Sequence, residues 1–226
     1  MAYQWDFTPV VANAPLLAQG LLNTLKVTST ALVFGVMLGL VLALMRLSPR
    51  RYLAWPAGFI IEVFRTTPPL VQLFWFFFAL PLIVGIEMTP FMAASVTFSI
   101  QSAAFFAEVF RGGIVSIERG QWDGARAIGM THGQALRRII LPQAVKRMIP
   151  AFMERAIELM KTTTLVATIA YPDLLFAANE ISQKTFRQLE TFTVAALIYF
   201  IVITTFSLLA RRFERRWAAS GESTAL

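Results

Sequence analysis

Long apolar stretches separated by short polar ones dominate the chain. A helix needs about 20 apolar residues to cross the hydrocarbon core of a bilayer. Stretches of about that length or longer cover residues 21–45, 52–84, 90–110, 149–170 and 191–209. The pattern therefore predicts an all-α membrane protein with five transmembrane helices.

The second predicted span is interrupted. Its stretch RTTPPL, at 65–70, contains Pro68 and Pro69. Proline removes a backbone donor and clashes with the preceding turn of a helix. We therefore expect this span to be broken into two helical pieces.

Composition and charge agree with this class. Only 15% of the 226 residues are charged and 57% are hydrophobic, whereas soluble domains carry about 25% charged residues. The net charge of +7 would suggest a nucleic-acid partner in a soluble protein. Here the basic residues gather in the alternate connections, at 46–51, 111–147 and 211–216. Because arginine and lysine concentrate on the cytoplasmic side, we predict an outside N-terminus, an inside C-terminus and no nucleic-acid partner.

Several kinds of chemistry are absent from the sequence. It has no cysteine, and its one histidine, His132, argues against a histidine-rich metal site or a Ser-His-Asp triad. No stretch has the glycine, four residues, Gly-Lys-Ser/Thr pattern of a phosphate-binding loop. We therefore expect no metal, no cofactor and no enzymatic activity in this chain.

The connection 111–148 contains GQWDGARAIGMTHGQALRRIILPQA at 120–144. A short helix is predicted at 122–128, ended by Gly129 in a left-handed conformation. Thr131 and Gln134 fit a capping box that starts a second, basic helix. Pro142 marks the end of that helix or a kink in it.

Two interpretations of this connection remain open on these grounds. A basic amphipathic hairpin can lie on anionic lipid, or the same surface can dock a cytoplasmic protein.

The spacing of this loop resembles a known motif. Asp-Gly-Ala, three residues, Gly, nine residues, Ile, one residue and Leu-Pro is similar to the EAA loop in permease subunits of bacterial ABC importers. Asp123 and Gly124 depart from the Glu and Ala of that family. The stretches at 20–32, 62–77, 107–121 and 161–166 resemble the polar amino acid branch, which includes histidine, glutamine, arginine, glutamate/aspartate and opine importers.

The resemblance implies a single transmembrane domain over 1–226, with a type I permease core at 20–209 in the bacterial cytoplasmic membrane. It implies alternating access, a dimer of separate ATP-binding subunits that hold ATP and magnesium, a second identical or homologous permease, a periplasmic solute-binding protein and an amino acid substrate. It also implies that 111–148 couples to the ATPase. The expected coupling residues are Asp123, Gly124, Ala125, Arg126, Ile128, Gly129, Ile139, Leu141 and Pro142. The competing class, an ion-coupled secondary transporter or channel subunit, should show inverted repeats, and none is detectable.

Ionisable groups within spans are costly and usually functional. At helical spacing, Arg155, Glu158 and Thr162 share one face. Glu62 with Arg65, and Glu158 with Lys161, are spaced to pair. These groups either form intrahelical ion pairs or line a substrate pathway. The candidate pathway residues are Arg65, Gln101, Arg155, Glu158, Lys161 and Thr162.

Unpaired cationic groups in such a pathway would favour an anionic side chain. We therefore favour a polar and acidic substrate such as glutamate or aspartate. Beyond the last span, the small polar residues at 218–226 predict a disordered tail.

Overall fold

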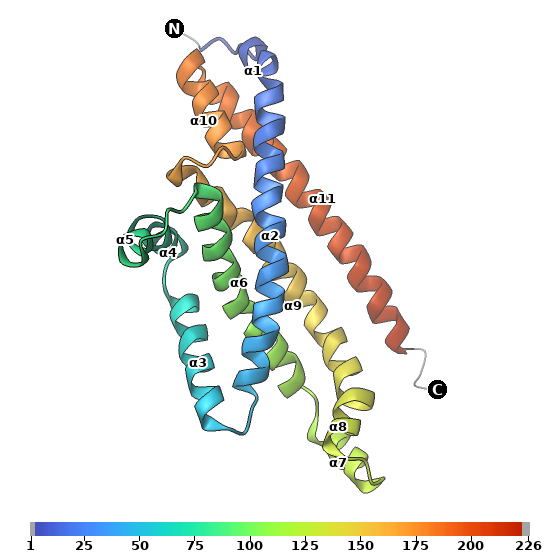
Figure 1. The fold of residues 1–226 in the computed structure, drawn as a ribbon. Helices are drawn as coiled ribbons and strands as arrows, with labels where there is room; N and C mark the ends of the chain where they lie inside the picture. The colour runs from blue at the N-terminus through green and yellow to red at the C-terminus, as the bar shows by residue number, and fades with distance from the viewer. Residues whose placement is uncertain (1–2, 223–226) are drawn as a thin grey trace.

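The computed structural model describes residues 3–222, with side chains described as far as Arg212, and this part of the chain contains helices and no strands. Figure 1 shows the helices in order. The α-helices are α1 (Thr8–Ala12), α2 (Ala14–Arg46), α3 (Arg51–Thr66), α4 (Pro69–Phe74), α5 (Leu80–Val84), α6 (Pro90–Val115), α7 (Arg119–Ala127), α8 (His132–Ala135), α9 (Leu141–Thr162), α10 (Leu174–Thr185) and α11 (Gln188–Glu222). Two π-helical segments, η1 (Trp75–Ala79) and η2 (Leu136–Ile140), and a 3-10 helix, η3 (Thr163–Ile169), complete the described elements. The predicted all-α class is confirmed.

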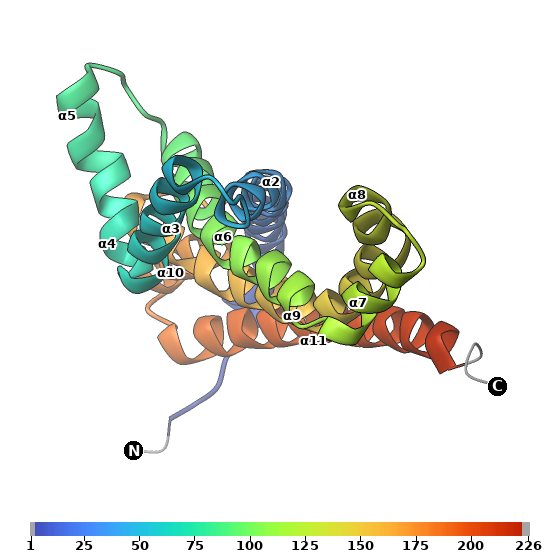
Figure 2. The ribbon, with the colours of Figure 1, turned by 90° about the horizontal axis from the view of Figure 1, so that it is seen from below.

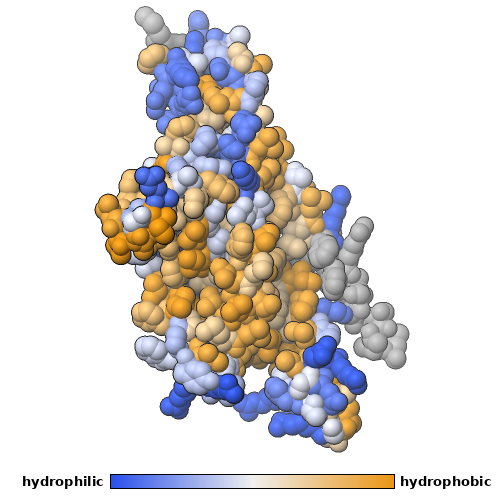
Figure 3. All heavy atoms as spheres, in the orientation of Figure 1, coloured by the Kyte–Doolittle hydropathy of each residue, from blue (hydrophilic) through white to orange (hydrophobic). Residues whose placement is uncertain are grey.

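Three described helices, α2, α6 and α11, are long and apolar enough to cross a membrane. The pair Arg51–Thr66 and Pro69–Val84 makes a fourth span if it is counted as one, although its halves are bent by 107°. On the face seen in Figure 3, apolar residues cover most of the middle of the molecule and hydrophilic residues gather at both ends. The predicted span at 149–170 falls on α9 and η3. These helices are not counted as a span, because four charged residues interrupt the apolar run: Glu154, Arg155, Glu158 and Lys161.

The core of the bundle is the close packing of α2 against α6. Every fourth residue along one face of α2 is small and buried, at Ala31, Gly35, Gly39 and Ala43. A Cβ added at Gly35 would meet the Ser102 Cβ at 2.6 Å. Small residues let membrane helices approach closely enough for extensive van der Waals contact. This stripe therefore fixes α6 beside α2.

The second predicted span is broken where the prolines predicted it. Thr67 and Pro68 are extended, with ψ angles of 140° and 135°. A residue before proline avoids the helical region for steric reasons. The chain therefore turns sharply after α3, and Figure 2 shows α4 and α5 on one side of α6 with α7 and α8 on the other.

The helix after Thr131 does not end at Pro142. Instead α8 passes through η2 directly into α9, and Pro142 lies in the first turn of α9. A π-helical segment re-spaces the backbone hydrogen bonds of a helix, and η2 occupies the turn before Pro142. Of the two predicted outcomes, an end at Pro142 is wrong, because the chain stays helical through Thr162; a kink stays a prediction.

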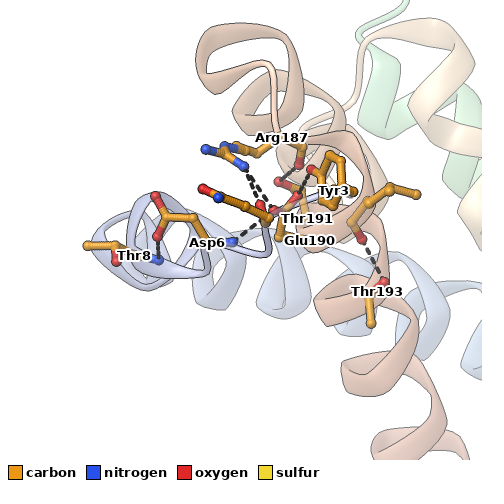
Figure 4. Close-up of polar contacts among 9 residues, drawn as sticks. Tyr3, Asp6, Thr8, Arg187, Glu190, Thr191 and Thr193 are labelled. Carbon is orange, nitrogen blue, oxygen red and sulfur yellow. Dashed lines mark hydrogen bonds and ion pairs between the residues drawn. The ribbon is translucent and has the colours of Figure 1, made fainter. Parts of the chain in front are cut away.

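The two ends of the bundle differ. The N-terminus, α1 and α10 lie at one end, while α7, α8 and the connection between α2 and α3 lie at the other (Figure 1). At the first end, the carboxylate of the fully buried Glu190 accepts from the Tyr3 hydroxyl at 2.6 Å and from the Asp6 amide at 3.0 Å (Figure 4). Arg187 donates to the same carboxylate at 3.3 Å and to the Gln4 carbonyl at 2.9 Å. The N-terminal segment is thereby fastened to the start of α11.

Two features of the C-terminal half were not predicted. The helix α10 was missed, although Asp173 caps it by accepting from the Phe176 amide at 2.8 Å, and its buried Leu174, Ala177, Ala178 and Ile181 have helical spacing. The helix α11 runs to Glu222, so it covers the first part of the tail 218–226; residues 223–226 lie outside the described residues.

Candidate functional site

A polar cavity of about 220 Å³ lies between the bend after α3, the middle of α6 and the C-terminal half of α9. Its lining includes five of the six candidate pathway residues: Arg65, Gln101, Arg155, Glu158 and Thr162. Lys161 is exposed and is not part of the lining. Three elements that are distant in sequence therefore bring this polar set together.

Two arginines, one from α3 and one from α9, lie over the same phenylalanine ring. Arg155 donates to Glu158 at 2.7 Å, and its guanidinium carbon lies 4.6 Å from the centroid of Phe105 on α6. The guanidinium of Arg65 lies 5.8 Å from the same centroid. A guanidinium over an aromatic face is attracted by the ring quadrupole. Phe105 thus gathers two cationic groups from two other helices at the cavity.

Two of the predicted pairings do not occur in the described structure. Glu158 pairs with Arg155 and not with Lys161, and Glu62 forms no ion pair with Arg65, which points toward Phe105. At the cavity Arg155 remains about one-third exposed and Glu158 more than half exposed. Arginine binds carboxylates through paired donors, and Glu158 can accept from an ammonium group. The side chains of Arg155 and Glu158 can therefore bind the carboxylate and the ammonium group of a zwitterion.

A second cavity, of about 490 Å³, shares Arg65, Phe105 and Arg155 with the first. Its other lining residues come from the ends of α6 and α9 nearest α7, and include Ser116 and Arg147. The ring of Phe105 therefore borders both hollows. Sequence reasoning missed Phe105, because one phenylalanine among 20 gives no local signal.

The loop at the other end of the molecule has the predicted caps. Gly129 has φ +76°, its amide donates to the Arg126 carbonyl at 3.0 Å, and the Met130 amide donates to the Ala125 carbonyl at 3.1 Å. These two bonds are a Schellman motif. The capping box is also formed, since Thr131 accepts from the Gln134 amide and Gln134 accepts from the Thr131 amide. Both predictions from local spacing are confirmed.

Packing and hydrogen bonds hold the loop between α6 and α9 in place. Ile117, Ile140, Ala144 and Met148 form a buried cluster against which Trp122, Leu136 and Ile139 pack. Arg147 donates to the Ser116 carbonyl, and Gln143 donates to Gln121 at 3.1 Å. These contacts fasten α7 to the start of α9.

The candidate coupling residues divide by exposure. Ala125 is buried, and Ile139 packs on the cluster above. Asp123 and Arg126 form an exposed ion pair, and Ile128 is 70% exposed. A Cβ added at Gly124 would touch nothing within 4 Å. Leu141 is exposed and Pro142 follows it at the start of α9. One face of α7 is thus free to meet another protein.

No group of three or more His, Cys, Asp or Glu side chains suited to a metal ion occurs among the described residues. A helical membrane fold with a polar cavity between its helices, and a capped helix projecting from one end, is an arrangement expected of a membrane transport subunit. Residues 35–219 match the family model of the binding-protein-dependent transport system inner membrane component. The chain belongs to this family, and it is an inner-membrane permease of the amino acid ABC importers with the type I fold.

Relatives from different bacteria support this assignment. The chain is 37% identical over 96% of its length to the glutamate/aspartate import permease protein GltK of Escherichia coli O6:H1, and covers 100% of that protein. It is 34% identical over 93% of its length to the arginine transport system permease protein ArtQ of Bacillus subtilis, and covers 96% of it. A crystal structure of an amino acid ABC transporter with histidines superposes with a TM-score of 0.90 at 38% identity, covering 95% of this chain and 100% of that one. Membership of this family rules out the secondary transporter or channel subunit considered from the sequence.

Proposed function

We propose that the chain translocates a polar amino acid by alternating access, driven by ATP hydrolysis in separate subunits. The single observation that carries the proposal is the cavity lined by Arg65, Gln101, Arg155, Glu158 and Thr162. Lys161 lies outside this lining and is not among the proposed substrate contacts.

We propose further that the amino acid is acidic. The guanidinium groups of Arg65 and Arg155 both lie near Phe105, whereas the one carboxylate in the lining, Glu158, is paired with Arg155. This excess of positive charge favours a substrate with two carboxylates. GltK, whose name gives glutamate and aspartate, supports this choice, while ArtQ, named for arginine, provides the competing outcome.

We propose that the segment 111–148 is the coupling loop. Its exposed α7 face, with Asp123, Gly124, Arg126 and Ile128, would enter a cleft of the ATP-binding subunit, and Gly129 would hold that face at a fixed angle. The buried Ala125 and the packed Ile139, with Leu141 and Pro142 at the start of α9, would transmit the motion to the spans. The firm packing of this loop supports the role, because a lever must be rigid.

The proposed topology has five spans in one domain: α2, the bent α3–α5, α6, α9 with η3, and α11. Basic connections at the α7 end support an inside position for that end and an outside position for the N-terminus. The implied assembly contains two permeases, two ATP-binding subunits that bind ATP and magnesium, and a periplasmic binding protein.

Uptake into proteoliposomes tests the proposal. The permease would be reconstituted with its ATP-binding and binding-protein subunits and offered radiolabelled glutamate, aspartate, glutamine, arginine and histidine, with ATP or a non-hydrolysable analogue inside. We expect ATP-dependent uptake that is greatest for glutamate or aspartate. ATP-dependent uptake of arginine alone would overturn the acidic assignment, and uptake that ignores ATP would overturn the importer mechanism.

A further inference from the structure

The bend after α3 leaves backbone acceptors without their usual donors. The last four carbonyls of a helix have no partner within that helix. Beyond α3 the chain is extended at Thr67 and Pro68, and neither Pro68 nor Pro69 has an N–H group. The Val63 carbonyl accepts from the Thr67 amide at 3.1 Å. Donors for the carbonyls that follow it must come from a side chain or from water.

Gln72, on α4, supplies a donor for one of them and for the residue that follows the helix. Its Nε2 lies 3.1 Å from the Phe64 carbonyl oxygen, 3.0 Å from the Thr67 carbonyl oxygen and 2.5 Å from Thr67 Oγ1. Thr67 Oγ1 in turn donates to the Val63 carbonyl at 2.7 Å. One side-chain amide thus joins the end of α3 to the start of α4 across the two prolines.

The orientation of this amide is set by its surroundings. The Thr67 hydroxyl proton is directed to Val63, so all three groups near the Gln72 nitrogen present acceptors. The amide turned by 180° would place an oxygen against them, which fixes the assignment of nitrogen and oxygen. Gln72 is only 6% exposed, and its Oε1 has no hydrogen-bond partner in the described structure. A buried acceptor left unpaired costs free energy, so the three contacts of Gln72 Nε2 form against a local cost.

The bend carries part of the cavity. Arg65, Thr67 and Pro69 line it from just before and just after the turn, and the adjacent Leu73 is fully buried in the core cluster. We propose that Gln72 is a positioning residue that fixes the 107° bend and thereby places Arg65 and Thr67 in the cavity. We call the contacts of Gln72 with Phe64 and Thr67 the Gln72 clamp. Its effect on transport rests on the function proposed above, whereas its effect on the bend does not.

The clamp can be tested without transport. The chain has no cysteine, so spin labels can be attached at Phe59→Cys on α3 and Ile83→Cys on α5, both exposed positions. Gln72→Met keeps a similar volume and removes the donors, and we expect it to broaden the label-to-label distance distribution in proteoliposomes. Gln19→Met, at an exposed glutamine of α2, should leave the distribution unchanged. A Gln72→Met distribution identical to that of the wild type would overturn the proposal.

Transport by the full complex tests the link to Arg65, with whichever labelled amino acid the wild type imports. We expect Gln72→Met to raise the half-saturating concentration about tenfold, Arg65→Gln to do the same, and the double variant to raise it no further, because residues acting through one another are not additive. If Gln72 supported the fold without positioning Arg65, the two substitutions would raise the half-saturating concentration additively. That result would overturn the proposed link between Gln72 and Arg65. Absence of ATP-driven uptake by the wild type would count against the proposed function. The label-to-label distances would still show whether Gln72 holds the bend.

Discussion

The guanidinium of Arg155 lies over the ring of Phe105, with 4.6 Å between its central carbon and the ring centroid. Arg155 belongs to α9 and Phe105 to α6, so the contact joins two helices at the polar cavity. The aromatic face attracts a cation without neutralising it, and in the described structure Glu158 is the carboxylate that pairs with this guanidinium.

Arg155→Gln should change substrate preference. Loss of the guanidinium removes a charge-assisted hydrogen bond worth about 1.5–3 kcal/mol, so uptake of glutamate should fall about tenfold or more relative to glutamine. Competition between the two labelled amino acids in reconstituted uptake measures this ratio. Arg51→Gln, at an exposed position on α3, is the matched control. An unchanged uptake spectrum would remove Arg155 from the site.

Gly129→Asp should leave the protein in the membrane and abolish transport. Gly129 has φ +76°, a conformation that costs a non-glycine residue roughly 1–2 kcal/mol, and the new side chain adds charge beside α7. Membrane fractionation and ATP-driven uptake measure the two effects. Gly133→Asp adds the same charge within α8 without a left-handed backbone and should retain uptake. Normal uptake by Gly129→Asp would refute the coupling role.

Gly124→Ala should stabilise α7 and preserve transport. Alanine favours a helix interior by about 0.8–1 kcal/mol over glycine, and the added Cβ has open space. Hydrogen exchange of the α7 amides should slow, while uptake stays at the wild-type level. Lost uptake with slowed exchange would show that the partner needs the close approach that glycine permits.

Asp173→Asn should raise stability above pH 6. Burial raises the pKa of Asp173 from 3.8 to about 6, against the opposing hydrogen bonds from the Phe176 and Leu175 amides and from Tyr199. The folded state therefore holds the proton more tightly than the unfolded state does, and stability is lost as pH rises from about 4 through about 6. At about 1.4 kcal/mol per pKa unit, the cost above pH 6 is on the order of 3 kcal/mol.

Asparagine keeps the cap of α10 and cannot ionise. Thermal unfolding in detergent should show the variant above the wild type at pH 7 and level with it near pH 4. A difference that does not vary with pH would contradict the assignment of the titrating group.

Tyr3→Phe should loosen the N-terminal segment. The hydroxyl of Tyr3 donates to Glu190 at 2.6 Å, and this bond also raises the pKa of Tyr3. Without it, the bond from the Asp6 amide to Glu190 should open more often, and hydrogen exchange at Asp6 should quicken. Tyr52→Phe, on the exposed start of α3, is the control. Equal exchange rates in the two variants would show that Tyr3 does not fasten the segment.

Local features were predictable wherever neighbouring residues decide the structure. The capping box of Thr131 and Gln134 and the left-handed Gly129 depend on a few consecutive residues, and both predictions were correct. The break at Pro68 and Pro69 was predictable for the same reason, since proline acts on its own turn and on the residue before it.

The wrong predictions concern places where contacts between distant residues determine the structure. The sequence predicted that a helix could end at Pro142, but the chain stays helical there, where Ile140, Ala144 and Met148 pack in a buried cluster. Lys161 was placed with Glu158 on spacing alone, whereas Glu158 pairs with Arg155, the residue that Phe105 holds from another helix.

The sequence alone determined the all-α class, the charge asymmetry between connections and the capped loop, because each follows from residues close together in the chain. Only the tertiary structure decided that Gln101, Arg155 and the bend at Thr67 share one cavity, and that Gln72 closes the bend. The physical reason is that a buried polar group is stabilised by the partners that packing brings to it. Those partners come from α3, α4, α6 and α9, whose arrangement no local pattern contains.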